Sequence, residues 1–166
     1  LIDRRERRRF ANLAEIFGAL AEAPLGALLA KGGAAPLYCE EMGFVEQVAA
    51  FSSASMVAAV HGACLTNSLY MAPGSLVVDA VPVRNFLGAG VTMPLECGVT
   101  WFWTLTYNVG VRYRPLLLPA GDFDADAVHV PPERLVEALL AGMRNGSWPA
   151  AAAPPDASAG LATAPP

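Results

Sequence analysis

Two groups of residues have types and spacings suited to holding a phosphate. Arg4 and Arg8 lie four residues apart in an arginine-rich run, and guanidinium groups can grip a pyrophosphate through paired hydrogen bonds. His61, Gly62 and Ala63 follow a short apolar run. Gly62 and Ala63 are small enough to allow close approach of a ligand. A helix expected to begin there would attract an anion with its first N–H groups.

Two polar residues further along belong to the same candidate site. Asn67 falls inside the expected helix, where asparagine is a poor helix former. Its side chain is therefore expected either to bond the neighbouring backbone or to line a ligand cleft. Asp79 follows the apolar run 76–78 and is expected at the carboxyl end of a strand. Ligands of open α/β sheets bind at such ends, so Asp79 and His61 are predicted at the edge where a nucleotide would sit.

These residues also have structural interpretations. An arginine run is often a solvated basic loop or a localisation signal, and we assign Arg5, Arg7 and Arg9 to the surface. A single histidine is more often a structural hydrogen-bonding group than a catalytic one. We interpret Trp101 and Trp103 as core residues and not as sugar-stacking platforms, because large aromatic side chains mainly fill cores.

Hydrophobic periodicity and breaker residues predict the elements that must position this site. Asn12 has the spacing of a helix cap with Glu15 three residues later. The segment 99–107 suits either a buried helix or a strand, and 83–98 is expected to be a loop. One strand is expected to end at residue 2, and further strands are expected over 36–40, 56–60, 76–78 and 113–118. Helices are expected over 12–23, 43–53, 63–70 and 131–145.

Composition limits the class of protein. The 166 residues have a net charge of −4, 54% hydrophobic residues and a mean hydropathy of +0.39. A chain this acidic outside one arginine run is not expected to coat nucleic acid. Polar residues and Pro73-Gly74 interrupt the apolar stretch 48–78 too often for a membrane-spanning helix, whereas a buried parallel sheet explains its apolarity. Three cysteines leave at most one disulfide and one thiol.

The central motifs resemble glycosyltransferase family 61. The order is His-Gly-Ala-x-Leu-Thr-Asn from His61, then Pro-Gly-Ser from Pro73, then an apolar strand that ends in an acid followed by Pro82. Upstream, Arg4, Arg8 and Asn12 match a similar Arg-x-x-x-Arg-x-x-x-Asn pattern. Phe-x-Glu-Gln at 44–47 and Gly-x-x-Tyr at 110–113 are two further, weaker matches, and the family places a helix before the second, which favours a helix over 99–107.

The resemblance implies a fold, a donor and a mechanism. The family includes plant xylan arabinosyl- and xylosyltransferases and lumenal O-GlcNAc transferases of animals. The implied fold is α/β, a Rossmann-like, mostly parallel sheet with flanking helices, which forms the C-terminal half of a two-domain GT-B glycosyltransferase. The implied reaction is inverting transfer from a UDP-sugar to a hydroxyl of a glycan or protein, without a required metal, in the Golgi or ER lumen.

The resemblance also distributes roles over the site. It implies donor contacts for Arg4, Arg8, His61, Gly62, Ala63 and Asn67, with His61 as the candidate catalytic residue. Asp79 would accept hydrogen bonds from the ribose, although family members more often carry glutamate there. Cys64 replaces a usual glycine and would narrow the pocket.

The resemblance and the composition of the C-terminal segment also predict how the chain is divided into domains. We expect residues 1–148 to form one nucleotide-sugar-binding domain of a longer chain and 149–166 to be a disordered Ala/Pro-rich tail. The acceptor-activating base is expected on a missing N-terminal domain.

Other functions stay open at this point. No dinucleotide-binding glycine motif, Walker loop or nucleophile elbow is present, and the two widely separated histidines make a zinc site improbable. The departures at Cys64 and Asp79 also allow a nucleotide-binding module without transfer activity. An α/β interaction domain that keeps only the fold is the third alternative.

Overall fold

The structure, a computed structural model, describes residues 1–26, 35–84, 101–122 and 124–144. In these residues a five-stranded sheet has the order β3-β1-β4-β5-β6, and all of its neighbouring strands are parallel. The strands are β1 (Ile2–Asp3), β3 (Leu37–Tyr38), β4 (Met56–Val60), β5 (Leu76–Arg84) and β6 (Arg112–Asp122). The predicted Rossmann-like α/β fold is confirmed.

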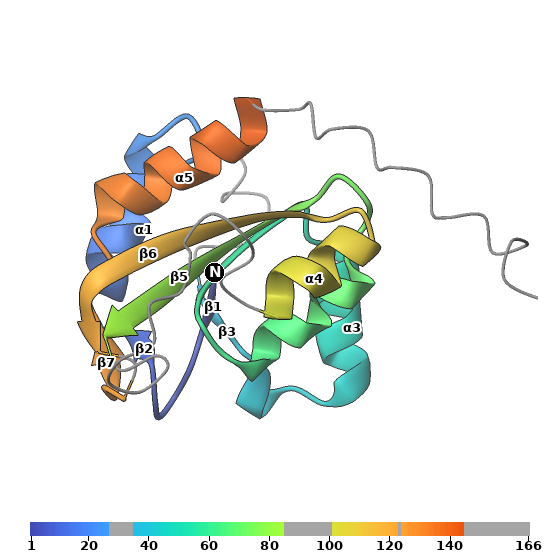
Figure 1. Ribbon diagram of the computed structural model, residues 1–166, viewed down its shortest axis with the longest axis horizontal. Helices are drawn as coiled ribbons and strands as arrows, with labels where there is room; N and C mark the ends of the chain where they lie inside the picture. Colours follow the sequence, from blue (N-terminus) through green and yellow to red (C-terminus); the bar gives the residue numbers. More distant parts are fainter. Residues whose placement is uncertain (27–34, 85–100, 123, 145–166) are drawn as a thin grey trace, which may run out of the picture.

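Helices cover both faces of the sheet (Figure 1). On one face lie α1 (Leu13–Glu22) and α5 (Pro132–Arg144). On the other lie α3 (Phe44–Ser53), α4 (Trp101–Asn108) and the 3₁₀ helix η2 (Ala63–Tyr70). A short 3₁₀ turn, η1 (Cys39–Glu41), follows β3. Among the described helices, none is long and apolar enough to cross a membrane.

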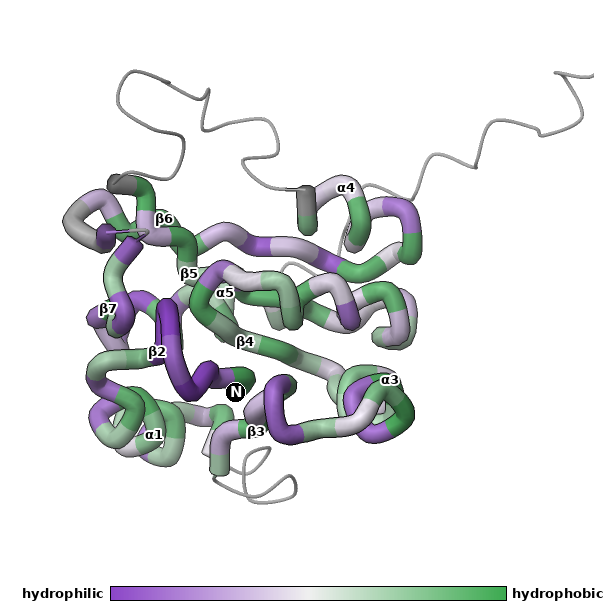
Figure 2. The backbone as a smooth tube through the Cα atoms, turned by 90° about the horizontal axis from the view of Figure 1, so that it is seen from below, coloured by the Kyte–Doolittle hydropathy of each residue, from purple (hydrophilic) through white to green (hydrophobic). Residues whose placement is uncertain are grey.

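The central strands are apolar because both of their faces are covered. Along β4, Ala58 and Val60 belong to the core under α1 and α5, whereas Val57 and Ala59 belong to the core under α3, η2 and α4. Figure 2 shows β4 and β5 as mainly hydrophobic tube, in contrast to the strongly hydrophilic segment between β1 and β2. This two-sided burial explains why β4 has no polar residue.

The strand order creates a topological switch point. Counted along the chain, the five strands lie in the order 2-1-3-4-5, so the connections leave β1 and β4 in opposite directions across the sheet. In sheets of this order the ligand binds outside the carboxyl ends of the two strands at the switch. The residues that follow these two ends here are Arg4 and His61.

Strands β5 and β6 are longer than the sequence predicted. Asp79 was expected to end its strand, but β5 continues to Arg84. The pairing with β4 stops at Ala80, and only β6 accompanies β5 beyond that point. Pro82, which has no N–H, is therefore tolerated because one side of the strand has no ladder there. Asp79 is thus in the middle of a strand and not at its end, which corrects the prediction.

A second small sheet was not predicted. Strand β2 (Arg9–Phe10) pairs in parallel with β7 (Ala127–Val128). Asn12 strengthens the same junction, because its side-chain amide donates to the Val130 carbonyl (3.0 Å) and accepts from the Val130 N–H (3.1 Å). Asn12 is the N-cap residue of α1, as predicted, but its side chain makes no cap hydrogen bond to the helix backbone, and its amide donates to the Glu15 side chain.

Of the other predictions from the sequence, some are confirmed, one is wrong and some concern residues that the structure does not describe. The bounds of β4 and η2 agree with the predicted 56–60 and 63–70, and 101–108 is a helix. Trp103 is 39% exposed and stacks on Tyr107, so its assignment to the core is wrong, whereas the side chain of Trp101 lies outside what the structure describes. The expected loop over 83–98 and the expected tail over 149–166 fall largely or wholly outside the described residues.

Two helical glycines should respond oppositely to alanine. A Cβ at Gly142 in α5 would overlap the Leu76 side chain in the core, whereas a Cβ at Gly18 in α1 would meet nothing within 4 Å. Gly142→Ala is expected to lower the free energy of unfolding by about 1–2 kcal/mol, because overpacking outweighs the gain in helix propensity. Gly18→Ala should raise it by about 0.5–1 kcal/mol. Urea unfolding of both variants measures this, and a stabilised Gly142→Ala would contradict the packing.

Candidate functional site at the switch between β1 and β4

Arg4 lies at the carboxyl end of β1, against the start of η2. A Cβ at Gly62 would lie 3.3 Å from Arg4 Nη1, so the missing side chain of Gly62 leaves room for the guanidinium to pack closely against the backbone. Arg4 Nε bonds Glu40 of η1 at 3.2 Å. Arg4 Nη1 is buried and has no hydrogen-bond acceptor among the described residues. A buried cationic donor without an acceptor is suited to an anion that arrives from outside the chain.

The backbone of the arginine loop is held at both ends. Asp3 Oδ1 accepts from the Phe10 N–H at 2.8 Å, and the Arg8 N–H donates to the Ala125 carbonyl at 3.3 Å. Arg8 has φ = 57°, a left-handed conformation that is uncommon for a residue with a side chain. Such strained residues concentrate at functional sites, where surrounding contacts hold them.

Arg8 belongs electrostatically to the same site as Arg4. Partial burial lowers the pKa of Arg8, and the charges of Arg4 and Arg7 lower it further, whereas Asp124 and Asp79 act in the opposite direction. Arginine still keeps its proton in proteins.

His61 follows β4 and forms part of a buried network. His61 Nδ1 lies 2.8 Å from Asp79 Oδ2, and the Tyr113 hydroxyl donates to the same oxygen at 2.5 Å. The Phe102 ring lies 5.1 Å from the imidazole. Asp79 is fully buried, and His61 is 6% exposed. Tyr113 was not predicted as a site residue.

Gly62 and Ala63 form the N-terminus of η2, as predicted. Gly62 precedes the helix in extended conformation, and the Leu65 N–H donates to the Gly62 carbonyl at 3.0 Å. Cys64, in the first turn, forms a disulfide with Cys39 of η1, with a Cα–Cα distance of 6.2 Å. This pairing fastens the segment that carries Glu40 to the helix that begins at Ala63.

Asn67 lies further along η2 and is half-buried. Its amide donates to the Gln47 side chain of α3 at 2.6 Å, and Gln47 in turn donates to the Cys39 and Met42 carbonyls. These contacts connect η2, α3 and η1. The donor contact of Asn67 stays a prediction, and the ribose contact of Asp79 does too.

The structure therefore brings most of the predicted residues together. Arg4, Gly62 and Ala63 lie at the switch between β1 and β4, and Arg8 is close enough to Arg4 and Asp79 to feel their charges. We call Arg4, Arg8, His61, Gly62 and Ala63 the switch-point site. Within the ranges that the structure describes, no group of three or more His, Cys, Asp and Glu side chains is placed to hold a metal ion.

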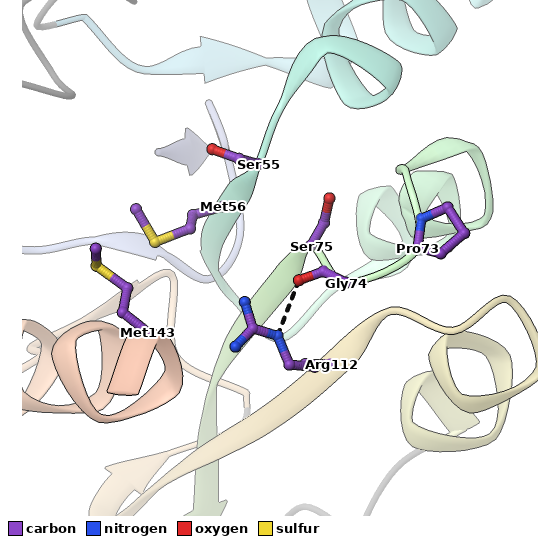
Figure 3. Close-up of a pocket in the computed structure, with 7 residues that line it drawn as sticks. All are labelled: Ser55, Met56, Pro73, Gly74, Ser75, Arg112 and Met143. Atoms are coloured by element: carbon purple, nitrogen blue, oxygen red, sulfur yellow. Dashed lines mark hydrogen bonds between the residues drawn. The ribbon is translucent and has the colours of Figure 1, made fainter. Parts of the chain in front are cut away.

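A different hollow lies at the opposite edge of the sheet (Figure 3). This pocket of about 420 Å³ is lined by residues near the amino ends of β4, β5 and β6 and the end of α5, among them Met56, Ser75 and Met143. Arg112 lies within it, but its guanidinium donates to the Gly74 and Gly142 carbonyls. Arg112 therefore serves as a brace between the turn before β5 and the end of α5.

Comparison with known proteins agrees with the geometry. Residues 1–78 match the family model described as Glycosyltransferase 61. This match runs from β1 into the start of β5 and ends one residue before Asp79. No curated protein matches the chain. The family match supports a glycosyltransferase activity. The resemblance to glycosyltransferase family 61 is thus confirmed over residues 1–78, which hold every residue of the switch-point site.

Proposed function

We propose that this chain binds the nucleotide-sugar donor of an inverting glycosyltransferase, with a UDP-sugar as the donor and a hydroxyl of a glycan or protein as the acceptor. One observation carries the proposal: two arginines, a histidine and a helix N-terminus meet at the switch between β1 and β4. Each of these groups binds phosphate, and the switch point is where α/β sheets of this order hold nucleotides.

We assign the roles in the proposed reaction from the charges of the groups. As the sugar leaves, negative charge grows on the diphosphate, and preorganised positive groups lower the barrier most when they face that charge. Arg4, Arg8 and the N-terminus of η2 would fill this role without a metal. The base that deprotonates the acceptor hydroxyl would come from an N-terminal domain of the complete enzyme, which would also bind the acceptor.

We also propose that the enzyme works in the lumen of the ER or Golgi. The Cys39–Cys64 disulfide supports this location, because structural disulfides form and persist in oxidising compartments. No role with nucleic acid is proposed for this acidic chain.

Calorimetric titration with UDP, beside ADP and GDP, tests the donor site. We expect saturable binding selective for UDP. Arg8→Ala should weaken it by about tenfold or more, because a charge-assisted contact to phosphate is lost, and His61→Ala should weaken it as well. Arg9→Ala is the control, because Arg9 belongs to the same run and is exposed.

The outcome separates the alternative functions. Binding of UDP no tighter than that of ADP by the folded chain would overturn the donor assignment and favour an α/β interaction domain. UDP binding without donor hydrolysis or transfer by the complete protein would indicate a nucleotide-binding module.

A further inference from the structure

We propose that Tyr113 and Asp79 are positioning residues that fix the orientation and the protonated nitrogen of His61 in the switch-point site. The inference rests on the proposed function for its consequence, since His61 is useful only if a donor binds. Its structural content stands on contacts between three neighbouring strands: His61 follows β4, Asp79 is in β5, and Tyr113 is in β6.

The register brings these side chains to one face of the sheet. Ala59 pairs with Asp79, and Val77 pairs with Tyr113. Because side chains alternate along a strand, Asp79 shares the face of Val77, which is the face covered by α3, η2 and α4. Tyr113 belongs to the core on that same face, and Phe102 of α4 packs against the imidazole.

The chemistry of the contacts assigns the proton. A carboxylate only accepts hydrogen bonds, so His61 Nδ1 must be the donor to Asp79 Oδ2. The Tyr113 hydroxyl is the second donor to that oxygen. Two donors on Oδ2 hold the carboxylate in a single orientation, whereas its other oxygen, Oδ1, is buried without a hydrogen-bond partner among the described residues. With Nδ1 committed to Asp79, Nε2 is the nitrogen with which His61 addresses any other group.

The consequence for the reaction depends on the state of His61. A neutral ring with its proton on Nδ1 offers Nε2 as an acceptor, whereas a protonated ring offers Nε2–H as a donor to a phosphate oxygen. Asp79 supports both states because it accepts from Nδ1 in each. Tyr113, in β6, therefore acts on the donor through Asp79 and His61.

Nuclear magnetic resonance of the ¹⁵N-histidine-labelled chain without any nucleotide tests the positioning directly. The chain has two histidines, and the His129→Gln variant assigns the signals of His61. We expect the Nδ1-protonated form, with a downfield Nδ1–H proton. Asp79→Leu should abolish this form, and Tyr113→Phe should shift the Nδ1–H resonance because Asp79 loses its other donor. Tyr70→Phe is the control, since Tyr70 is exposed and lies against Phe44.

The inference is overturned if folded wild-type chain carries the proton on Nε2, or if Tyr113→Phe leaves the His61 signals unchanged. UDP titration adds the functional arm: Tyr113→Phe should weaken binding by about threefold to tenfold, and Tyr70→Phe should not. If the expected histidine signals appear but the wild-type chain does not bind UDP, the proposed function fails and the positioning stands. If UDP binds but the His61 signals differ from expectation, the positioning by Asp79 and Tyr113 is overturned and the proposed function stands.

Discussion

Replacing Arg4 by alanine is expected to weaken UDP binding by about tenfold to a hundredfold, because a charge-assisted hydrogen bond contributes about 1.5–3 kcal/mol. Arg4 is the arginine whose guanidinium lies against Gly62 and whose Nη1 is buried without an acceptor among the described residues. An incoming phosphate would give that donor a partner. Calorimetry of the variant measures the loss.

Arg5 provides the matched control for this prediction. Both arginines follow β1, and each bonds a glutamate of η1 through Nε: Arg4 pairs with Glu40, and Arg5 pairs with Glu41. The Arg5 guanidinium, however, stacks on the Tyr38 ring, at 3.5 Å from the ring centroid. Arg5→Ala removes the same charge and the same kind of ion pair, and we expect UDP affinity within about twofold of wild type. If Arg4→Ala and Arg5→Ala lost UDP affinity equally, the binding would depend only on the overall positive charge of the loop and not on a direct contact from Arg4.

Loss of the Cys39–Cys64 disulfide is expected to lower the free energy of unfolding by about 3 kcal/mol. The bond closes a loop with a sequence separation of 25, and a crosslink of this length removes much of the conformational entropy of the unfolded chain. Urea unfolding of Cys39→Ser and of Cys64→Ser measures the effect. Cys97→Ser, outside the disulfide, controls for the replacement of a cysteine by serine as such.

The same variants test whether the disulfide also organises the donor site. Because the bond fastens η1 to η2, its loss frees the segment that holds Glu40 against Arg4. We therefore expect weaker UDP binding at temperatures where the variants stay folded. Unchanged stability in the two serine variants would contradict this account of the crosslink.

Local sequence patterns predicted the elements around the switch point well. The run Met56–Val60 has no polar residue and is bounded by serines and glycine, so it reads as a strand buried on both faces. The helix 63–70 follows a small-residue turn. Patterns of this kind depend on the near neighbours of each residue, which is why the bounds of β4 and η2 agree with the structure.

Pairing between strands that are distant in the sequence could not be predicted from local patterns. A polar residue at position 79 and a proline at position 82 predicted that the strand ends at Asp79. In the structure, however, β6 pairs with β5 beyond both residues. The link between Tyr113 and Asp79 depends on that register, and a register between distant strands leaves no mark in a single sequence. The pairing of Cys39 with Cys64 was open for the same reason.

The junction between β2 and β7 also determines when the arginine loop takes its shape. Arg8, Arg9 and Ala11 donate backbone hydrogen bonds to Ala125, Asp126 and Val128, more than a hundred residues later in the chain. Contacts of such high sequence separation are costly to close and form late in folding. The backbone bonds that hold Arg8 in its left-handed conformation can therefore form only after β7 has been synthesised. The segment that matches the glycosyltransferase family contains both arginines, but on its own it lacks the strand that completes their loop.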